Sequence, residues 1–333
     1  MRKIRIAFRD YWADFPQKRE SYLILRILRK HYEVEISEDP DYVFFSVMGD
    51  SHWGVPDRCI KIFHTGENLV PDFNACDYAI GFEWMEYGDR YLRFPLYLFY
   101  SQELLDDLQH KHELPEGWDP EVEKSGFCSF VVSNRDNPER NEAYRRLSEY
   151  RHVDSGGRFM NNVGGPVEDK RAFEGSHKFS LCYENGSHPG YTTEKLVEAL
   201  ANRTIPIYWG DPEVGKVFNT RSFINVMDYG SFEEVLRRVE QLDQDKEAYL
   251  RMLREPAFRP DAPSLEEEYA RLEKWLLSIF EQPLEKAQRR NRANQGKIYV
   301  DKRLVLDRKA NRKQIRAYWL RRVKTGWKKL MGR

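Results

Sequence analysis

A lysine lies where the physics of a helix start would not place one. Lys195 follows Glu194 in the first turn of a helix predicted at residues 192–202, after a strand at 179–183 and a glycine-bearing loop. A helix start carries about half a positive charge and unpaired N–H groups, so it favours Glu194 and mildly repels Lys195. A bound anion would explain the lysine, because such helix starts bind phosphate. This segment alone leaves a surface lysine on an ordinary βαβ unit equally possible.

Further polar residues follow two other predicted strands. Asn134 and Arg140 come after a strand at 127–133, and Glu67 comes after a strand at 60–64. Arg140 opens a helix, as Lys195 does. Open α/β sheets bind ligands outside the carboxyl ends of their strands. Two cations at two helix starts could hold a diphosphate, with the arginine as a planar fork and the lysine as a point charge.

The elements that position these residues form two α/β domains. A chain of 333 residues suggests more than one domain. Apolar runs bounded by turn residues alternate with amphipathic segments, which is typical of parallel sheets covered on both faces. Pro206 indicates that its strand begins at or after that residue. Strands are expected at 4–8, 42–47, 60–64, 78–82, 127–133, 179–183, 204–208 and 222–226, with helices at 18–31, 139–150, 192–202, 232–254 and 265–280 and a linker at 101–125.

This pattern predicts two Rossmann-like domains that face a cleft. We expect one domain at residues 1–115, a second at 116–260, a closing helix at 261–285 and a basic tail at 286–333. No long apolar run and no signal peptide is visible, which predicts a cytosolic protein. The cysteines have no C-x-x-C spacing and suit reduced, buried thiols. The pairs Asp39/Asp41 and Asp243/Asp245 fit turns and surfaces, and no metal is expected.

The charge is unevenly distributed along the chain. Residues 286–333 hold 18 of the 54 basic residues but only Asp301 and Asp307 among the 54 acidic ones, so the tail carries +16 and the body −16. Within residues 310–333 an apolar stripe including Trp319 and Trp327 runs between cationic side chains, which suits the surface of an anionic membrane. The alternatives are that the tail packs on the body or on a partner, or that it binds nucleic acid. We predict that it does not bind nucleic acid. The expected location is therefore the inner face of the cytoplasmic membrane.

Three blocks of the sequence resemble a known family, the α-1,3-fucosyltransferases of glycosyltransferase family 10. The donor signature of that family is similar to YENGSHPGYTTEKLVEAL followed by TIPIYWGDP, and a second donor block to FVVSNRDNPERNEAYRRL. The bacterial acceptor block resembles FHTGENLVPDFNACDYAIGFEW. Tyr183 stands where many members have Phe, and the loop GSHPG varies within the family.

The resemblance implies a fold of the GT-B type and a reaction. GDP-L-fucose would be the donor, no cofactor would be required, and the acceptor would be a GlcNAc hydroxyl of an oligosaccharide or lipid-linked glycan. The linkage would be α-1,3, or α-1,4, formed with inversion, as in Lewis-antigen or lipopolysaccharide O-chain synthesis. The residues that match the family's site are Glu67 as base, Arg140 and Lys195 on the diphosphate, Glu194 on donor hydroxyls, and Asn134, Asn185 and Tyr191 lining the donor pocket.

Two other functions stay open at this point. One is a two-domain transferase that uses another nucleotide sugar, because residue types alone indicate only a nucleotide-phosphate enzyme. The other is a binding protein without turnover, which the joint presence of Glu67, Arg140, Glu194 and Lys195 argues against. His64, directly before the turn Thr65–Asn68 that contains Glu67, could orient an acceptor or simply pack in its strand. The sequence does not decide the type of acceptor chain or the oligomeric state.

Overall fold

The computed structural model describes residues 1–291, 296, 298–306, 308–310, 312, 313 and 316. These residues divide into two compact units, one made of 1–80, 87–92 and the residues from 273 onward, the other of 81–86 and 93–272. The predicted α/β class is confirmed. The functional boundary at 115/116 stays a prediction. Most of the amphipathic segment 310–333 lies outside the described residues. None of the helices among the described residues combines the length and the hydrophobicity that a membrane-spanning helix requires.

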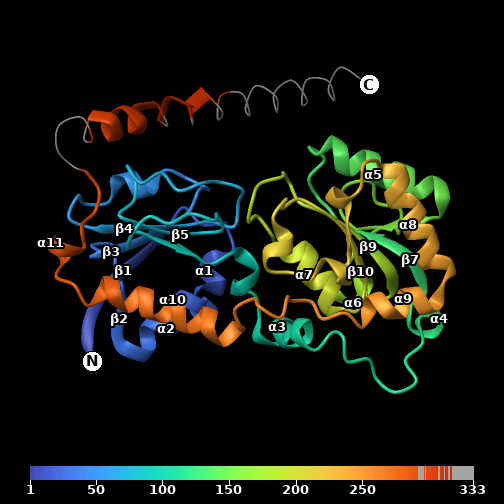
Figure 1. Ribbon diagram of the computed structural model, residues 1–333. Helices are drawn as coiled ribbons and strands as arrows, with labels where there is room; N and C mark the ends of the chain where they lie inside the picture. Colours follow the sequence, from blue (N-terminus) through green and yellow to red (C-terminus); the bar gives the residue numbers. More distant parts are fainter. Residues whose placement is uncertain (292–295, 297, 307, 311, 314–315, 317–333) are drawn as a thin grey trace. The chain divides into compact units, whose positions relative to one another are not determined.

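The first unit is built on a six-stranded sheet with the order β2-β1-β3-β4-β5-β6 (Figure 1). Strands β1 to β5 pair in parallel. Every residue of β3 and β4 is buried, so both faces of the sheet are covered, as the apolar runs predict. The elements are β1 (Arg2–Arg9), α1 (Phe15–Lys18), α2 (Leu23–His31), β2 (Tyr32–Ile36), β3 (Tyr42–Phe45), β4 (Ile60–His64), β5 (Tyr78–Gly81), β6 (Tyr91–Arg93) and α11 (Leu284–Ala287). Helix α10 (Leu265–Phe280) is divided between the two units, with the residues from 273 onward in the first.

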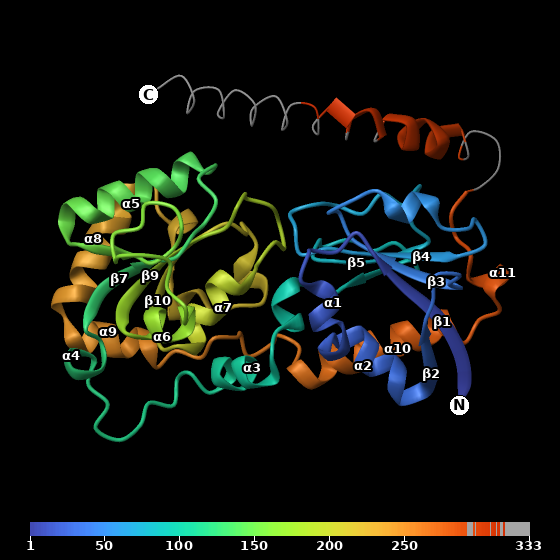
Figure 2. The ribbon, with the colours of Figure 1, turned by 180° about the vertical axis from the view of Figure 1, so that it is seen from behind.

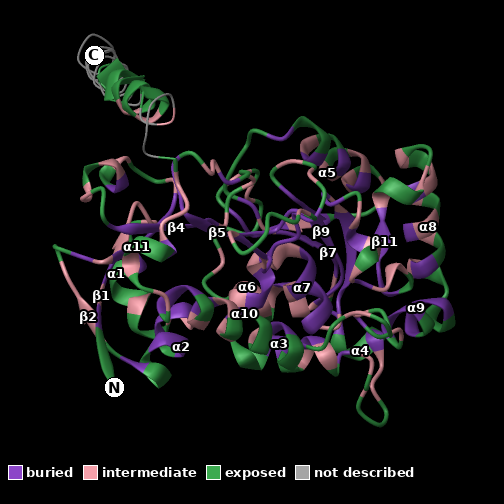
Figure 3. Ribbon diagram, turned by 60° about the vertical axis from the view of Figure 1, so that its left-hand side comes forward, coloured by how far each residue is buried: buried purple, intermediate pink, exposed green. Residues whose placement is uncertain are grey.

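The second unit is built on a five-stranded parallel sheet with the order β11-β10-β9-β7-β8. Its core joins the strands to α5, α8 and α9, and α5 and α8 lie on one side of the sheet (Figures 1 and 2). The strands are coloured as buried in Figure 3, whereas the helices present exposed outer faces. The elements are α3 (Gln102–Gln109), α4 (Pro120–Glu123), β7 (Gly126–Phe130), α5 (Pro138–Tyr150), β8 (Val153–Ser155), α6 (Lys170–Gly175), β9 (His177–Tyr183), α7 (Glu194–Ala201), β10 (Ile205–Trp209), β11 (Ile224–Asn225), α8 (Phe232–Gln244) and α9 (Lys246–Leu253).

Two expectations about local structure are wrong, and a third segment holds a helix that was not expected. The predicted helix at 232–254 is two helices, because Asp245 leaves the helical conformation and its side chain caps Ala248 N. Strand β10 begins at Ile205, one residue before Pro206. Its pairing with β11 starts only at Ile207, so the missing N–H of Pro206 costs no hydrogen bond to β11. The predicted linker at 101–125 contains helix α3, which Ser101 caps through its side chain.

The beginning of the basic tail packs on the first unit. Asp77 is fully buried; its Oδ1 accepts hydrogen bonds from the backbone N–H groups of Arg289 and Arg290, at 2.9 Å each. Its Oδ2 accepts from Arg290 Nε at 2.9 Å and from Lys61 N at 2.7 Å. Arg289 also pairs with Asp89. For these first residues, packing on the acidic body is therefore observed.

Lys111 should make stability depend on pH. Its Nζ donates to Leu253 O at 3.0 Å in a buried position, and burial lowers the pKa of Lys111 to about 7. Between pH 7 and the pKa of an unfolded lysine, about 10.5, the unfolded chain binds a proton that the folded chain lacks. The unfolding free energy should then rise with pH, by up to about 1.4 kcal/mol per pH unit for this one group.

Replacing Lys111 with Met should remove this contribution. Urea denaturation of both proteins at pH 7, 8 and 9 checks it: the difference in unfolding free energy between wild type and Lys111→Met should grow in favour of wild type as pH rises. Lys246, an exposed partner of Asp119, serves as the control site for a Lys→Met change. A pH-independent difference for Lys111→Met would show that the lysine is charged in the folded protein throughout.

Candidate functional site

Two loops meet at the topological switch point of the second unit's sheet. In chain order its strands lie 2-1-3-4-5, so the order reverses between β7 and β9, where doubly wound sheets open a ligand crevice. The loop after β7 ends at Asn137, which caps the start of α5. Its side-chain Oδ1 accepts a hydrogen bond from Arg140 N at 2.9 Å. The Nδ2 of Asn137 donates to Glu184 O at 2.8 Å, in the loop after β9. The two predicted anion-binding loops are thus joined directly.

Arg140 is buried at the start of α5 and is incompletely bonded. Its Nη1 donates to Asn185 Oδ1 at 3.4 Å and its Nη2 to Asn134 O, whereas its buried Nε has no hydrogen-bond partner in the described part of the chain. Burial lowers the pKa of Arg140, and the Glu184 carboxylate acts in the opposite direction. A buried guanidinium with an unsatisfied N–H suits an anionic ligand. The structure therefore brings Asn134, Arg140 and Asn185 together.

Lys195 is held between two carboxylates. Its Nζ lies 3.1 Å from Glu184 Oε2, Glu194 Oε1 and Thr193 Oγ1. Burial alone would lower the pKa of Lys195, but Glu184 and Glu194 raise it, so the ammonium is charged. The interpretation that Lys195 needs a bound anion is therefore incomplete, because the protein supplies two anions itself.

Glu184 is the functional candidate that sequence reasoning missed. It is fully buried; its Oε1 accepts from Thr193 N at 2.8 Å and its Oε2 from Thr193 Oγ1 at 2.7 Å. Burial raises the pKa of Glu184, with Lys195 acting against that rise. A charged residue directly after a wholly buried strand was the available signal, since an unpaired carboxylate is rarely buried. Glu184 fixes the start of α7 and aims Lys195.

Glu194 differs from Glu184 in being partly open to solvent. Burial would raise the pKa of Glu194, but Lys195 and Lys170 lower it to about 2. Its Oε2 accepts from Tyr100 OH at 3.1 Å. Glu194 is thus an ionised acceptor that keeps about a quarter of its side chain exposed. A ligand hydroxyl could donate to it.

The loop between β9 and α7 is fixed at its far end as well. Asp211 Oδ1 accepts from Gly190 N at 2.8 Å, and its Oδ2 accepts from Thr192 Oγ1 at 3.1 Å. Gly190 has φ +85°, and a Cβ there would lie 2.2 Å from Phe82 O, so only glycine fits. Tyr191 is buried with its ring 5.0 Å from that of Phe82. The loop is therefore preorganised.

Glu67 belongs to the first unit. It follows β4, its side chain is exposed, and its backbone N donates to Thr65 Oγ1 at 3.1 Å. His64 is packed inside the same unit: Tyr22 OH lies 2.6 Å from its Nδ1, and burial lowers the pKa of His64 to about 3. Of the two interpretations of His64, acceptor orientation or packing in its strand, the neutral and buried ring supports packing. Glu67 keeps an exposed position at the carboxyl end of its strand.

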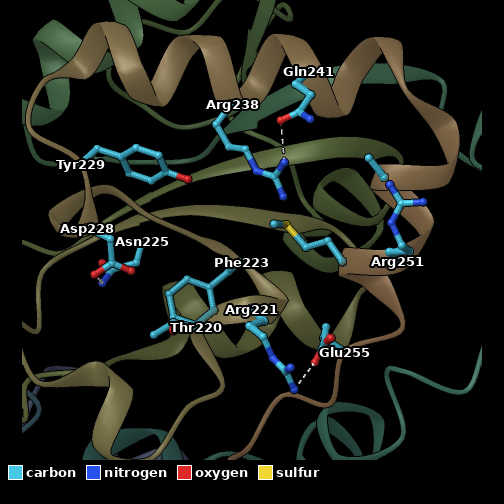
Figure 4. Close-up of a pocket in the computed structure, with 12 residues that line it drawn as sticks. Thr220, Arg221, Phe223, Asn225, Asp228, Tyr229, Arg238, Gln241, Arg251 and Glu255 are labelled. Carbon is cyan, nitrogen blue, oxygen red and sulfur yellow. Dashed lines mark hydrogen bonds and ion pairs between the residues drawn. The ribbon is translucent and has the colours of Figure 1, made fainter.

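A cavity elsewhere in the second unit does not involve these groups (Figure 4). It measures about 360 Å³ beside the edge strand β11 and is lined by Arg221, Arg238 and Arg251 among others. Two of these arginines are engaged, Arg221 with Glu255 and Arg238 with Gln241. None of the predicted site residues is among the described residues that line it, so it is not the candidate site.

The residues considered for metals have other partners. Asp39 and Asp41 pair with Arg5, and Asp243 pairs with Lys178 and Arg151. All four cysteines are buried and free. Among the described residues, no group of three or more His, Cys, Asp or Glu side chains could hold a metal ion.

Comparisons with known proteins identify the family. Residues 6–100 match the family described as "Alpha-(1,3)-fucosyltransferase FucT N-terminal domain", and residues 122–264 match "Glycosyltransferase family 10 (fucosyltransferase) C-term". A crystal structure of an α1,3-fucosyltransferase aligns with a TM-score of 0.75 and 30% identity, covering 88% of this chain and 93% of that one. The chain belongs to glycosyltransferase family 10.

Other relatives agree with this family 10 assignment. The chain is 35% identical over 285 residues to "Alpha-(1,3)-fucosyltransferase FucT" of Helicobacter pylori; the alignment covers 76% of this chain but 60% of that protein. An α1,3-fucosyltransferase crystallised with GDP-fucose aligns with a TM-score of 0.68 and 32% identity, over 83% of this chain and 91% of that one. The predicted GT-B-like architecture of two parallel-sheet domains is confirmed.

The two family regions divide the site residues of this family 10 chain. The C-terminal region, 122–264, contains the whole switch-point cluster of Asn134, Arg140, Glu184, Glu194 and Lys195. The N-terminal region, 6–100, contains Glu67. The resemblance stated from the sequence blocks is therefore confirmed at the level of the family.

Proposed function

We propose that the chain transfers L-fucose from GDP-L-fucose to a GlcNAc hydroxyl of a lactosamine-type glycan, forming an α-1,3 linkage with inversion. The observation that carries the proposal is the buried Arg140, with an unbonded Nε, at the same switch point as Lys195. The relatives named for α-1,3-fucosyl transfer, and the related structure with GDP-fucose, support this donor. No cofactor is required in this proposal.

The reaction is a single displacement. The acceptor oxygen forms a bond to the anomeric carbon of fucose while the bond from that carbon to the GDP oxygen breaks. Glu67 accepts the proton of the acceptor hydroxyl, and the exposed position of its side chain suits a base that must meet a substrate. Negative charge grows on the leaving diphosphate, where Arg140 and Lys195 stabilise it.

The carboxylates around Lys195 have a role in this scheme. Glu184 and Glu194 keep the ammonium in one place before the donor arrives, so little reorganisation is needed on binding. Glu194 can at the same time accept hydrogen bonds from donor hydroxyls. Asn134 and Asn185 line the donor pocket beside Arg140. Tyr191 shapes the pocket as a packed aromatic side chain.

The domain roles follow from these assignments. The N-terminal domain would bind the acceptor and the C-terminal domain GDP-fucose. A product of this kind occurs in Lewis-type or O-chain glycans, and a lipid-linked acceptor would suit a cytoplasmic enzyme whose residues 310–333 bind an anionic membrane.

Incubating the protein with a donor panel tests the proposal. GDP-fucose, GDP-mannose and UDP-sugars are each offered with N-acetyllactosamine, and the product linkage is analysed. We expect fucosyl transfer to the GlcNAc 3-hydroxyl, with other donors poorer by about 10²-fold or more. Faster transfer from another nucleotide sugar would establish the alternative transferase instead. GDP binding without any turnover would favour a binding protein.

A further inference from the structure

The first unit has a switch point of its own, and a cavity lies near it, lined by residues of β3 and β4 and of the loops after them. The order β2-β1-β3-β4-β5-β6 reverses between β1 and β3, so a ligand crevice is expected at the carboxyl ends of these two strands. The cavity measures about 320 Å³, within the range of small-molecule sites. Residues from the end of β3, the following turn, the loop after β4 and the C-terminal segment line it, among them Phe45, Ser46, His52, Trp53, Leu69, Val70 and Arg303.

Asp10, directly after β1, organises the wall of this cavity. Its Oδ1 accepts from Ser51 N at 2.9 Å and Ser51 Oγ at 2.6 Å, and its Oδ2 accepts from His52 N at 2.8 Å. Asp10 has φ +60°, an unfavourable conformation that these bonds hold in place. Gly49 leaves room for it, since a Cβ there would lie 2.6 Å from Asp10 Oδ1. Burial would raise the pKa of Asp10, but its bonds to His52 and Ser51 lower it to about 2, so it is a carboxylate.

His52 is oriented by that carboxylate. The tautomer with its proton on Nδ1 donates to Asp10 Oδ2, which lies 2.6 Å away, and in that tautomer Nε2 is an acceptor. The ring stacks on Phe45, with centroids 4.3 Å apart, and lies 4.7 Å from the ring of Trp53. No described residue bonds to Nε2. The cavity therefore has a fixed, unused acceptor beside an aromatic side chain.

The same cavity adjoins the segment that carries Glu67. Leu69 and Val70 line it, and Leu69 N donates to Glu67 O at 2.8 Å, so the lining begins two residues after the proposed base. A ligand in this cavity would be next to the loop that holds Glu67. A neutral sugar ring matches the lining, since it offers hydroxyl donors and an apolar face that packs on aromatic rings.

We propose that this cavity is a subsite for the acceptor glycan: His52 Nε2 accepts a hydrogen bond from a sugar hydroxyl other than the reacting one, and Trp53 packs on the ring. The inference rests on the proposed fucosyl transfer and assigns the substrate contact that positions the acceptor. Asp10 is a positioning residue in this scheme, because it acts through His52.

Steady-state kinetics of His52→Ala and Trp53→Ala test the subsite. Each change should raise the KM for N-acetyllactosamine about 10-fold, because one hydrogen bond or one ring contact is lost. The KM for GDP-fucose should stay unchanged. His52→Gln should recover part of the acceptor affinity, since its amide oxygen can accept near the position of Nε2. His31→Ala is the matched control, because His31 pairs with Glu273 at 2.6 Å outside this cavity and should behave as wild type.

Val70→Arg keeps the test decisive if the His52 variants fold poorly. Val70 is about half exposed, so an arginine should be tolerated by the fold while obstructing the cavity, and should raise the acceptor KM. Unchanged acceptor KM in folded His52→Ala, or in Val70→Arg, would overturn the subsite. Calorimetric titration of wild type and Val70→Arg with N-acetyllactosamine measures binding without turnover. Loss of binding in the variant supports the subsite even if GDP-fucose proves not to be the donor. Equal binding by the two proteins refutes the subsite.

Discussion

Glu67→Gln should lower the turnover of fucosyl transfer by about 10²- to 10⁴-fold, equivalent to about 3 to 5 kcal/mol of activation free energy. The amide keeps the shape of the side chain but cannot accept the proton of the acceptor hydroxyl. The affinity for GDP-fucose should stay within about twofold of wild type, because Glu67 follows β4 in the first unit, whereas the proposed donor contacts are on the second. Single-turnover rates and donor titration measure the two quantities separately.

Glu33→Gln is the matched control for this change. Glu33 is an exposed glutamate of the same unit, paired in register with Lys3 at the amino end of the sheet. Its replacement should leave turnover unchanged. A loss below about tenfold for Glu67→Gln would mean that another group accepts the proton.

Lys195→Met should weaken GDP binding about 10- to 100-fold and lower kcat/KM by about 10²- to 10³-fold, as the loss of a charge-assisted contact to the leaving group implies. It should also destabilise the fold, by about 3 to 5 kcal/mol, because it leaves the buried Glu184 carboxylate without its cation. The double variant Lys195→Met/Glu184→Gln removes the unpaired charge. Its stability should recover, whereas its affinity for GDP should not.

Lys170→Met separates the catalytic part of this loss from the structural part. Lys170 is likewise an ammonium between two carboxylates, 2.6 Å from Glu198 and 3.6 Å from Glu174, but it starts α6 rather than α7. Its replacement should lower the unfolding free energy and leave the affinity for GDP near wild type. Calorimetric titration with GDP and urea denaturation give both numbers. Equal GDP affinities for Lys195→Met and wild type would remove Lys195 from the donor site.

Much of the fold could be predicted because its strands are buried on both faces. The segments at 42–45 and 60–64 are continuous apolar or aromatic runs, with Lys61 as the one charged residue, and this pattern has few structural alternatives. Boundaries were harder to predict where a single side chain decides them. Asp245 ends one helix and caps the next, and a capping residue inside an amphipathic stretch looks like any surface carboxylate.

The candidate site shows the same division. The positions of Arg140 and Lys195 at helix starts follow from the order of strand, loop and helix, which is local information. The partners of Glu184 and Asp211 could not be predicted, because these contacts join residues 9 to 21 positions apart; for Glu184 only its place after a buried strand was a signal. The pairing of Asp10 with His52, 42 residues apart, is non-local in the same way. These three carboxylates hold loops in place, and that role appears only after folding.

A crystal structure of this chain with GDP tests the central claim most directly. The account predicts that the diphosphate lies at the ends of β7 and β9, with its oxygens within about 3.2 Å of both the Arg140 guanidinium and Lys195 Nζ. It also predicts that the Nε of Arg140 gains a partner. A nucleotide bound away from both cations, with Lys195 still bonded only to Glu184, Glu194 and Thr193, would contradict the account.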